Sequence, residues 1–215
     1  MLTHDTKGIL LVMSGPSGAG KGTLCAHLRE QIPVALSISA TTRAPRKGEQ
    51  EGVNYFFMTQ DEFKQKIQED GFIEWAKVYD NYYGTPRKYV EDMLDAGQNV
   101  MLEIDPQGAK SVKLRIPDAV LVFIMPPSYK ELERRIRGRG TETEEQIEKR
   151  LSCAVGEINT LAAYDYVIIN ADIQAAVDNL KAIIAAERCK VARNTSLPAT
   201  FILEKDSELY DPTKH

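Results

Sequence analysis

Apolar residues along the chain fall into four short continuous runs, separated by segments with helical spacing. The runs cover residues 8–13, 99–105, 119–125 and 164–170. Apolar positions three and four residues apart recur near 21–31, 86–96, 107–115, 128–137, 142–162 and 172–192. Short apolar runs joined through helices are typical of parallel strands that are buried on both faces. The pattern therefore predicts an α/β protein with a parallel β-sheet core and helices on both faces.

A longer segment with a different pattern, residues 35–85, interrupts this alternation. It holds the short alternating pieces ALSIS, VNYFF and GFIEWAKVY. One helix lies among them, and the pair Thr59 and Glu62 predicts a capping box at its start. We expect this segment to form a small mixed α/β lobe inserted into the sheet domain.

A second interruption, residues 127–150, predicts a lid of two helices hinged at the glycines of RRIRGRG. Capping boxes are expected at Ser128 with Glu131 and at Thr141 with Glu144. The whole chain, 1–215, is expected to form one domain. Its expected parts are a core (about 7–34, 86–126 and 151–192), the lobe (about 35–85), the helical lid (about 127–150) and a C-terminal tail (about 193–215). The tail is polar and lacks periodicity, and it is where a contact within a homo-oligomer is expected.

Composition and charge restrict the class of protein. The 215 residues are 43% hydrophobic and 27% charged, as in an ordinary soluble globular protein. The net charge of −4 argues against general nucleic-acid binding. The N-terminus MLTHDTK has the pattern of neither a signal peptide nor a membrane span, and Cys25, Cys153 and Cys189 lack zinc-site spacing. We expect a cytoplasmic protein with reduced thiols and with no nucleic-acid or membrane partner.

The stretch SGPSGAGKGT follows the first apolar run and opens the first helix. Gly15, Gly20 and Lys21 fit G-x-x-x-x-G-K, in which glycines let the backbone curl until several N–H groups point at one anion. The lysine reaches the β- and γ-phosphates, and the helix N-terminus adds partial positive charge. A glycine-rich turn is the alternative, but the position between strand and helix favours a nucleoside triphosphate site. The expected binding residues are Gly15, Pro16, Ser17, Gly18, Ala19, Gly20, Lys21, Gly22 and Thr23.

The inserted lobe carries groups suited to a phosphate monoester. Arg43 and Arg46 lie three residues apart in a loop, and arginine binds phosphate through a planar fork. Tyr55 and Tyr83 offer hydroxyl donors to the same phosphate. A solvated basic loop with tyrosines in the core is the alternative interpretation.

Glu74 interrupts an otherwise apolar strand. Its carboxylate either faces solvent on an alternating strand or points at a ligand. Guanine offers two adjacent donors, N1–H and the N2 amino group, which match the two carboxylate oxygens. Adenine presents a lone pair at N1, which a carboxylate repels, so such a site would discriminate between the two bases.

The lid segment concentrates positive charge, with four arginines between residues 134 and 139. Like charges this close repel one another, and a triphosphate would relieve the repulsion. Four glutamates follow between residues 142 and 148, so a partly self-neutralised surface is the alternative.

These motifs together resemble the guanylate kinase family. The stretches GPSGAGKGT, SATTRAPRKGE, FIEWAKVYDNYYGT, LEIDPQGAKSVK, IMPPS and LERRIRGRGTETEEQIEKRL occur in the family's order and spacing, from about residue 8 to about residue 190. The resemblance implies a P-loop enzyme that transfers the γ-phosphoryl group of ATP to GMP, and to dGMP, with Mg²⁺ bound to the ATP. The implied partners are the small molecules ATP and GMP.

The resemblance also assigns residues to each part of the site. Ser39, Glu74 and Thr85 are implied to contact guanine, with Glu103 on the GMP side. Arg43, Arg46, Tyr55 and Tyr83 would hold the GMP phosphate. Lys21, Arg43, Arg135, Arg139 and Arg150 are the implied catalytic residues, the last three approaching the transferred phosphoryl group. Asn170 matches the family's adenine-side loop.

Two positions depart from the family's usual pattern. Glu103 stands where aspartate is usual, and Gly22 stands where the loop normally has a serine or threonine that gives its hydroxyl to Mg²⁺. Thr23 is rotated about 100° further around the helix and cannot simply replace that hydroxyl. We therefore expect the ATP phosphates and water to hold Mg²⁺ mainly, with Asp105 orienting those waters and Glu103 as the second candidate.

Two other families remain as alternatives. The spelling GKGT occurs in adenylate kinases, but the 39–85 segment matches guanylate kinases. Some scaffold proteins carry guanylate-kinase-like domains that bind protein ligands and typically lack the loop lysine or the phosphate arginines. Lys21, Arg43 and Arg46 are all present here.

Overall fold

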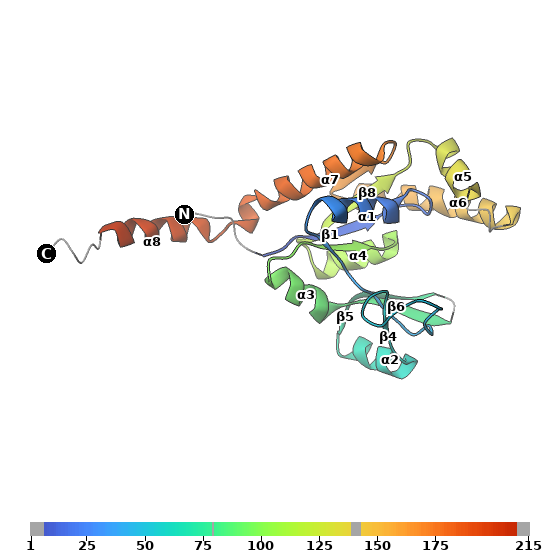
Figure 1. Ribbon diagram of the computed structural model, residues 1–215, viewed down its shortest axis with the longest axis horizontal. Helices are drawn as coiled ribbons and strands as arrows, with labels where there is room; N and C mark the ends of the chain where they lie inside the picture. The colour runs from blue at the N-terminus through green and yellow to red at the C-terminus, as the bar shows by residue number, and fades with distance from the viewer. Residues whose placement is uncertain (1–6, 79, 139–142, 210–215) are drawn as a thin grey trace.

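The computed structural model describes residues 7–78, 80–138 and 143–209, and a parallel sheet forms its centre (Figure 1). In this part of the chain the sheet has the order β2-β7-β1-β8-β9, and every neighbouring pair is parallel. The strands are β1 (Leu10–Ser14), β2 (Ala35–Leu36), β7 (Val100–Glu103), β8 (Val120–Met125) and β9 (Tyr166–Ile169). All four apolar runs form strands of this sheet, so the predicted α/β fold class is confirmed.

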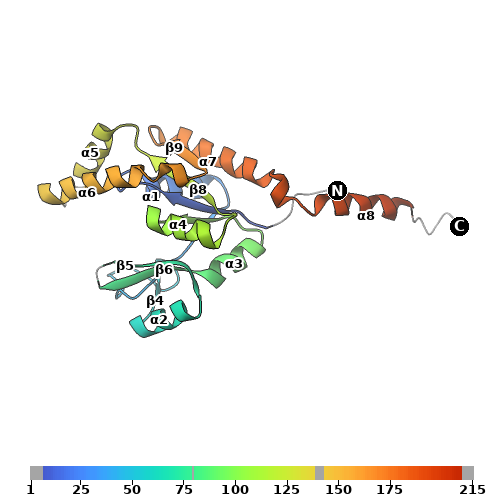
Figure 2. The same cartoon turned by 180° about the vertical axis from the view of Figure 1, so that it is seen from behind.

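Helices cover both faces of the core sheet (Figures 1 and 2). The first face is covered by α1 (Lys21–Gln31) and α7 (Ile173–Arg188), the second by α3 (Arg87–Asp95) and α4 (Pro106–Arg115). In β1, Leu11 and Met13 enter the cluster with α1 and α7, whereas Leu10 and Val12 enter the cluster with α3 and α4. Because successive side chains point to opposite faces and both faces are buried, the strand reads as a continuous apolar run.

A second sheet, of order β4-β3-β6-β5, forms the inserted lobe. Its strands are β3 (Ala40–Thr41), β4 (Phe56–Phe57), β5 (Phe72–Val78) and β6 (Asn81–Pro86), and α2 (Gln60–Gln68) lies among them. Thr59 and Glu62 form the predicted capping box at the start of α2. Phe63 of α2 is fully buried and stacks on Phe72, with 4.2 Å between the ring centroids. Residues 35–36 pair with β7 in the core sheet, so the sheet of the lobe begins at Ala40.

The lid consists of α5 (Tyr129–Arg137) and α6 (Glu144–Ile158), which share a small apolar cluster. Ser128 accepts a hydrogen bond from the backbone N–H of Glu131, as expected, but the reciprocal bond is not formed. The predicted cap of α6 at Thr141 is wrong. Thr143 is the N-cap, and it forms a capping box with Gln146; Thr141 itself lies outside the described residues. The sequence TETEEQ holds two overlapping box patterns, and the helix uses the second.

The C-terminal segment is helical, in contrast to the aperiodic tail expected from the sequence. A short 3-10 turn, η2 (Val191–Arg193), precedes α8 (Leu197–Leu209), which projects away from the body (Figures 1 and 2). Another 3-10 turn, η1 (Leu161–Ala163), lies earlier in the chain, between α6 and β9. Phe201, Ile202 and Leu203 are exposed on it. A single chain does not test the expected contact between copies, which stays a prediction. No helix in the described ranges has the length and apolar character needed to cross a bilayer.

The lobe depends on a very small core, which makes its stability sensitive to one side chain. We predict that Phe63→Ala lowers the free energy of unfolding by about 3–5 kcal/mol, because the cavity left among so few neighbours cannot be refilled. Leu114→Ala, at an exposed position of α4, is the matched control and should change it by less than about 0.5 kcal/mol. Urea denaturation measures both. Equal losses for the two variants would contradict the assignment of Phe63 as the centre of the lobe's core.

Candidate active site

The loop of residues 15–20 joins β1 to α1 and is built around glycines in unusual conformations. Gly15, Gly18 and Gly20 have φ angles of 133°, 90° and 90°, which other residues rarely adopt. An ideal Cβ on Gly15 would lie 2.2 Å from the carbonyl oxygen of Ile124 in β8. Only glycine fits this close approach. The loop opens directly onto the N-terminus of α1, whose partial positive charge favours an anion.

Lys21 lies over this loop. Its Nζ donates to the carbonyl oxygens of Gly15 at 2.6 Å and Pro16 at 3.2 Å. Burial lowers the pKa of Lys21, and the nearby carboxylates of Glu103 and Glu157 oppose that shift. The ammonium group is therefore already placed among the groups that would surround a bound polyphosphate.

The carbonyl of Ala19 connects the loop to two other parts of the chain. It accepts hydrogen bonds from Asn170 Nδ2 at 2.8 Å and from Arg135 Nη1 at 3.3 Å. Arg135 Nη2 also donates to the carbonyl oxygen of Asn170 at 3.0 Å. Asn170 follows β9 and is buried, and its side-chain amide points at the loop. Residues from β9 and from the lid thus hold one peptide group of the loop in place.

The lid packs directly on the loop. An ideal Cβ on Gly18 would lie 3.0 Å from the side chains of Leu132 and Ile136 in α5, so the two surfaces are in close contact. Arg150 of α6 approaches the loop from the other lid helix, with 3.5 Å between its Nη1 and Ser17 Oγ.

The lid arginines divide into two groups. Arg134 is paired with Glu131, and Arg137 is paired with Glu133 and Glu144. Both are thus neutralised, but of their partners only Glu144 belongs to the glutamates between residues 142 and 148 that the sequence suggested for this role. Arg135 also binds Glu131, but its guanidinium reaches the phosphate loop. Arg139 lies outside the described residues.

Glu74 is buried and faces inward. It pairs with Thr85 across β5 and β6, and Thr85 Oγ1 donates to Glu74 Oε1 at 2.6 Å. The other oxygen, Oε2, lies 3.3 Å from an ideal Cβ on Gly108, near the start of α4. Burial raises the pKa of Glu74. The alternative of a solvent-facing carboxylate on an alternating strand is excluded.

A cavity of about 160 Å³ lies between the lobe and the end of β7. It brings together several residues that the sequence places far apart, namely Ser39, Tyr55, Thr85 and Glu103. Ser37 and Asn54 line it as well. Sequence reasoning did not identify these two, because isolated serine and asparagine residues in a loop carry no specific signal.

Glu49 organises the arginine loop, a part that the sequence analysis did not assign. Arg43 Nη2 donates to both carboxylate oxygens of Glu49, at 2.8 and 2.9 Å, and the backbone N–H of Arg46 donates to Oε2 at 2.7 Å. The Arg43 guanidinium lies 5.4 Å from the ring centroid of Tyr55, which meets Tyr83 edge-on. Arg43, Tyr55 and Tyr83 are therefore together, whereas Arg46 is exposed on the same loop. The sequence did offer one signal for the role of Glu49, namely an acidic residue within an otherwise basic loop.

The acidic residues near the loop come from the ends of β7 and α6. Asp105 caps α4, and its Oδ1 accepts from the backbone N–H of Gly108 at 2.7 Å. Glu103 ends β7 and faces Gly22 of α1, since an ideal Cβ there would lie 3.5 Å from each carboxylate oxygen. Glu157 interacts electrostatically with Lys21, although nothing in its helical sequence context indicated this. In the ranges that the structure describes, no group of three or more His, Cys, Asp or Glu side chains gathers to hold a metal ion.

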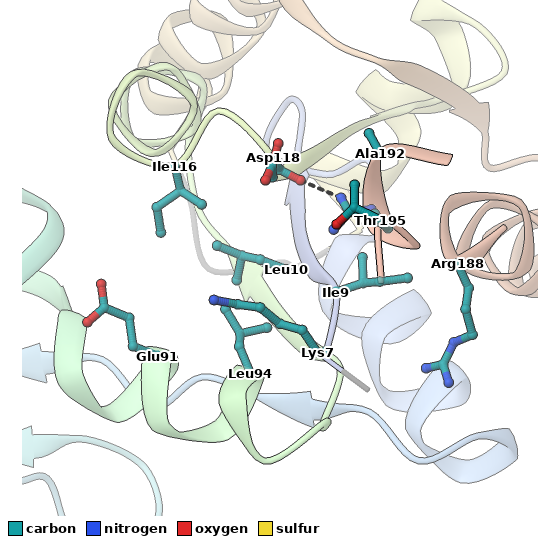
Figure 3. A pocket seen from close by; sticks show the side chains of 12 residues that line it. Lys7, Ile9, Leu10, Glu91, Leu94, Ile116, Asp118, Arg188, Ala192 and Thr195 are labelled. Atoms are coloured by element: carbon teal, nitrogen blue, oxygen red, sulfur yellow. Dashed lines mark hydrogen bonds between the residues drawn. The ribbon is translucent and has the colours of Figure 1, made fainter. Parts of the chain in front are cut away.

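A different cavity, of about 340 Å³, lies at the opposite end of the core strands, next to the start of β1 (Figure 3). Ile9 and Leu10 at the start of β1 line it, and Arg193 is bound there to the carbonyl oxygen of Asp118. Open parallel sheets bind ligands beyond the carboxyl ends of their strands. The glycine loop and Glu103 lie at those ends, so the candidate active site is there and not in the cavity of Figure 3.

A family model, sequence relatives and a solved structure that match this chain are all described as guanylate kinases. A family model described as guanylate kinase matches residues 7–187. A guanylate kinase of Caldanaerobacter subterraneus subsp. tengcongensis is 55% identical over 192 residues, which cover 89% of this chain and 93% of that protein. A guanylate kinase of Clostridioides difficile is 50% identical over 203 residues, covering 94% and 97%. The crystal structure of guanylate kinase from Anaplasma phagocytophilum matches with a TM-score of 0.73 and 38% identity, covering 92% of this chain and 95% of that one.

The loop geometry predicts that Gly15 tolerates no side chain. We expect Gly15→Ala to lower the free energy of unfolding by about 3 kcal/mol or more, because the new methyl group meets a backbone carbonyl that cannot move without shifting β8. Gly48→Ala is the matched control: its φ is 91°, but nothing lies within 4 Å of an added Cβ. The control should cost only the backbone strain, about 1–2 kcal/mol. Chemical denaturation compares the two, and a Gly15→Ala loss no larger than the control would contradict the close approach.

Proposed function

The chain belongs to the guanylate kinase family of phosphotransferases, and on that basis we propose that it transfers the γ-phosphoryl group of ATP to GMP. The products would be ADP and GDP, and dGMP would serve as a second acceptor. The observation that carries this proposal is the buried pair of Glu74 and Thr85, which stands beside a cavity at the carboxyl end of the core sheet.

Base choice follows from the chemistry of that pair. Thr85 binds one carboxylate oxygen of Glu74 and so fixes the orientation of the carboxylate. A carboxylate so held accepts from N1–H and the N2 amino group of guanine. Adenine would set its N1 lone pair against the same oxygens and leave them unpaired, which a buried site penalises strongly. The assigned groups address the base and the phosphate rather than the ribose 2′ position, which supports dGMP as an acceptor.

The acceptor phosphate would be held by Arg43, Arg46, Tyr55 and Tyr83. Glu49 keeps the fork of Arg43 in one orientation before any ligand binds. Such preorganisation reduces the ordering that phosphate binding requires. Arg46 extends from the same loop, whose backbone Glu49 also holds.

On the donor side, the backbone N–H groups of the glycine loop and the N-terminus of α1 would hold the ATP phosphates. Lys21 lies over the loop, and the negative charge of a triphosphate would stabilise its protonated form. Arg135 and Arg150 reach the loop from the lid, and Arg139 would join them. Phosphoryl transfer needs alignment and positive charge around the equatorial oxygens in a site closed to water, and these groups supply both.

Mg²⁺ is the expected companion of ATP, and the residues near the loop fit a hard cation. Glu103 and Asp105 offer carboxylate oxygens at the end of β7, and the phosphates and water would complete the ligand set. When bound, the ion supplies charge neutralisation between the phosphate groups. Asp105 already gives one oxygen to the cap of α4, which leaves its second oxygen for this task.

A coupled assay that follows ADP release tests the function directly, with GMP, dGMP, AMP and UMP as acceptors. We expect turnover with GMP and dGMP and little with AMP or UMP. Equal use of AMP would indicate an adenylate kinase and overturn the base assignment. Binding of GMP without any turnover would favour the scaffold class, in which the fold serves as a binding module.

The role of Glu74 generates a specific prediction. Glu74→Gln keeps one acceptor but sets an amide donor against a guanine donor, so kcat/KM for GMP should fall about ten- to a hundred-fold, equivalent to about 1.5–3 kcal/mol. The KM for ATP should change little. Glu69→Gln, at an exposed position of the same lobe, controls for loss of charge. An unchanged kcat/KM for GMP would refute the assignment.

The raised pKa of Glu74 predicts the acid limb of the pH profile. Guanine recognition needs the carboxylate form, so kcat/KM for GMP should fall as the pH drops through the pKa of Glu74. Since burial raises this pKa, the loss should begin above the usual glutamate value of about 4.3. The GMP phosphate titrates in both proteins, so the Glu74→Gln profile serves as the reference. Identical acid limbs in the two profiles would argue against a role for the Glu74 carboxylate.

A further inference from the structure

Gly22 and Glu103 form a steric pair that connects α1 to the end of β7. Gly22 is the second residue of α1, directly after Lys21. An ideal Cβ at Gly22 would lie 3.5 Å from Oε1 and 3.5 Å from Oε2 of Glu103. That separation is an ordinary van der Waals contact, so a hydroxyl group one bond beyond the Cβ would crowd the carboxylate if it pointed toward Glu103. Each of the two departures from the usual motifs thus sits against the other.

Glu103 also stands between the two halves of the site. In the sheet register it lies opposite Met13, next to the start of the glycine loop. Its side chain lines the cavity that contains Ser39, Tyr55 and Thr85. The carboxylate therefore faces both the loop that would hold ATP and the cavity that would hold the acceptor.

The neighbouring acid is less suited to face the loop. Asp105 Oδ1 is hydrogen-bonded to the backbone of α4, which fixes that carboxylate as a helix cap. Glu103 has a longer side chain, and its two oxygens are equidistant from the bare position on α1. Of the two carboxylates, Glu103 is the one that lies within contact distance of the position where the hydroxyl is missing. This reverses the order expected from the sequence.

We propose that Glu103 replaces the hydroxyl group absent at Gly22, so that its carboxylate is the protein's main oxygen donor toward the Mg²⁺ of Mg·ATP. The absence of a side chain at Gly22 leaves room for this carboxylate beside the start of α1. The inference rests on the proposed function in assuming that ATP is the donor. It goes beyond that function by naming one pair of residues that sets the metal dependence of ATP binding.

A carboxylate at this position affects ATP binding in a way that a hydroxyl would not. A carboxylate carries a negative charge, so without the metal it repels the ATP phosphates, and with the metal it attracts the cation that they carry. Glu103 should therefore weaken metal-free ATP binding and strengthen Mg·ATP binding. A residue that only contacts GMP would do neither.

Calorimetric titration of the full chain with the β,γ-imido analogue of ATP, in EDTA or in excess Mg²⁺ and without GMP, tests this without turnover. In Glu103→Gln we expect metal-free binding to be as tight as in the parent or tighter, and Mg-dependent binding to be about tenfold weaker. The Kd ratio, defined as the metal-free Kd divided by the Kd in excess Mg²⁺, should thus fall at least about tenfold. Glu30→Gln, an exposed position of α1, is the charge control and should leave the ratio unchanged. An unchanged ratio in Glu103→Gln overturns the proposal.

A second pair of variants tests the steric part. Gly22→Ser alone should weaken Mg-dependent binding, because the serine meets the Glu103 carboxylate. Adding Glu103→Asp should recover at least about threefold, because the shorter acid makes room for the hydroxyl. Additive effects would contradict the pairing. Circular dichroism confirms that each variant is folded.

The GMP assay on the parent protein separates this inference from the proposed function. If the parent phosphorylates GMP while Glu103→Gln keeps the parent's Kd ratio, the function stands and the inference fails. If the parent does not use GMP but the Kd ratio falls as expected, the function fails and Glu103 remains the metal-side residue. A change confined to the KM for GMP would assign Glu103 to the acceptor and overturn the proposal.

Discussion

The structure depends on the loop of residues 15–20, whose carbonyl groups accept hydrogen bonds from the side chains of Lys21, Asn170 and Arg135. Three glycines with positive φ give the loop its curl, and the close approach of Gly15 to Ile124 fixes its first turn against β8. The Ala19 carbonyl is held by Asn170, which directly follows β9, and by Arg135 of the lid. The core sheet and the lid thus meet at one short loop, whose backbone would be free to bind an anion with its N–H groups in the proposed function.

In the proposed function, the inserted lobe would add selectivity to this site through a buried acid. Burying Glu74 is unfavourable for its charged form and raises its pKa, and the hydrogen bond from Thr85 opposes that shift. Such a carboxylate gains most from a ligand that brings two donors. Burial makes the charged carboxylate unfavourable without a ligand. For the same reason, burial would make the binding of adenine unfavourable, because adenine leaves the carboxylate oxygens unpaired. In the arginine loop, Glu49 likewise holds Arg43 in one orientation before any ligand binds.

Periodicity and motif spacing predicted most of the architecture. Residues 21–31 form α1 at the predicted bounds, because the loop glycine defines its start and the chain becomes extended at Ile32. The box at Thr59 was also predicted, since a single pattern was available there. The start of α6 was predicted wrongly, because two overlapping capping-box patterns occur in TETEEQ and the local sequence does not choose between them.

Contacts between distant segments could not be predicted in the same way. Family resemblance named Arg43 and Glu74 as site residues, but neither periodicity nor spacing indicated that Glu49 holds Arg43. Glu103 and Gly22 appeared as two separate departures from a motif, and only the fold makes them neighbours. The contact of the Asn170 amide with Ala19, across most of the chain, was likewise not predicted, and the expected place of Asn170 on the adenine side stays a prediction. The C-terminal helix α8 lacks a periodic apolar face, so its sequence carried no helical signal.

The most direct test of this account is a crystal structure with an inhibitor that joins adenosine and guanosine through five phosphates. The account predicts that N1 and N2 of guanine lie within hydrogen-bond distance of the Glu74 carboxylate. The phosphates on the adenosine side should lie in the loop of residues 15–21. A guanine bound elsewhere, for example in the cavity of Figure 3, or a Glu74 carboxylate without contact to the base, would contradict the central claim.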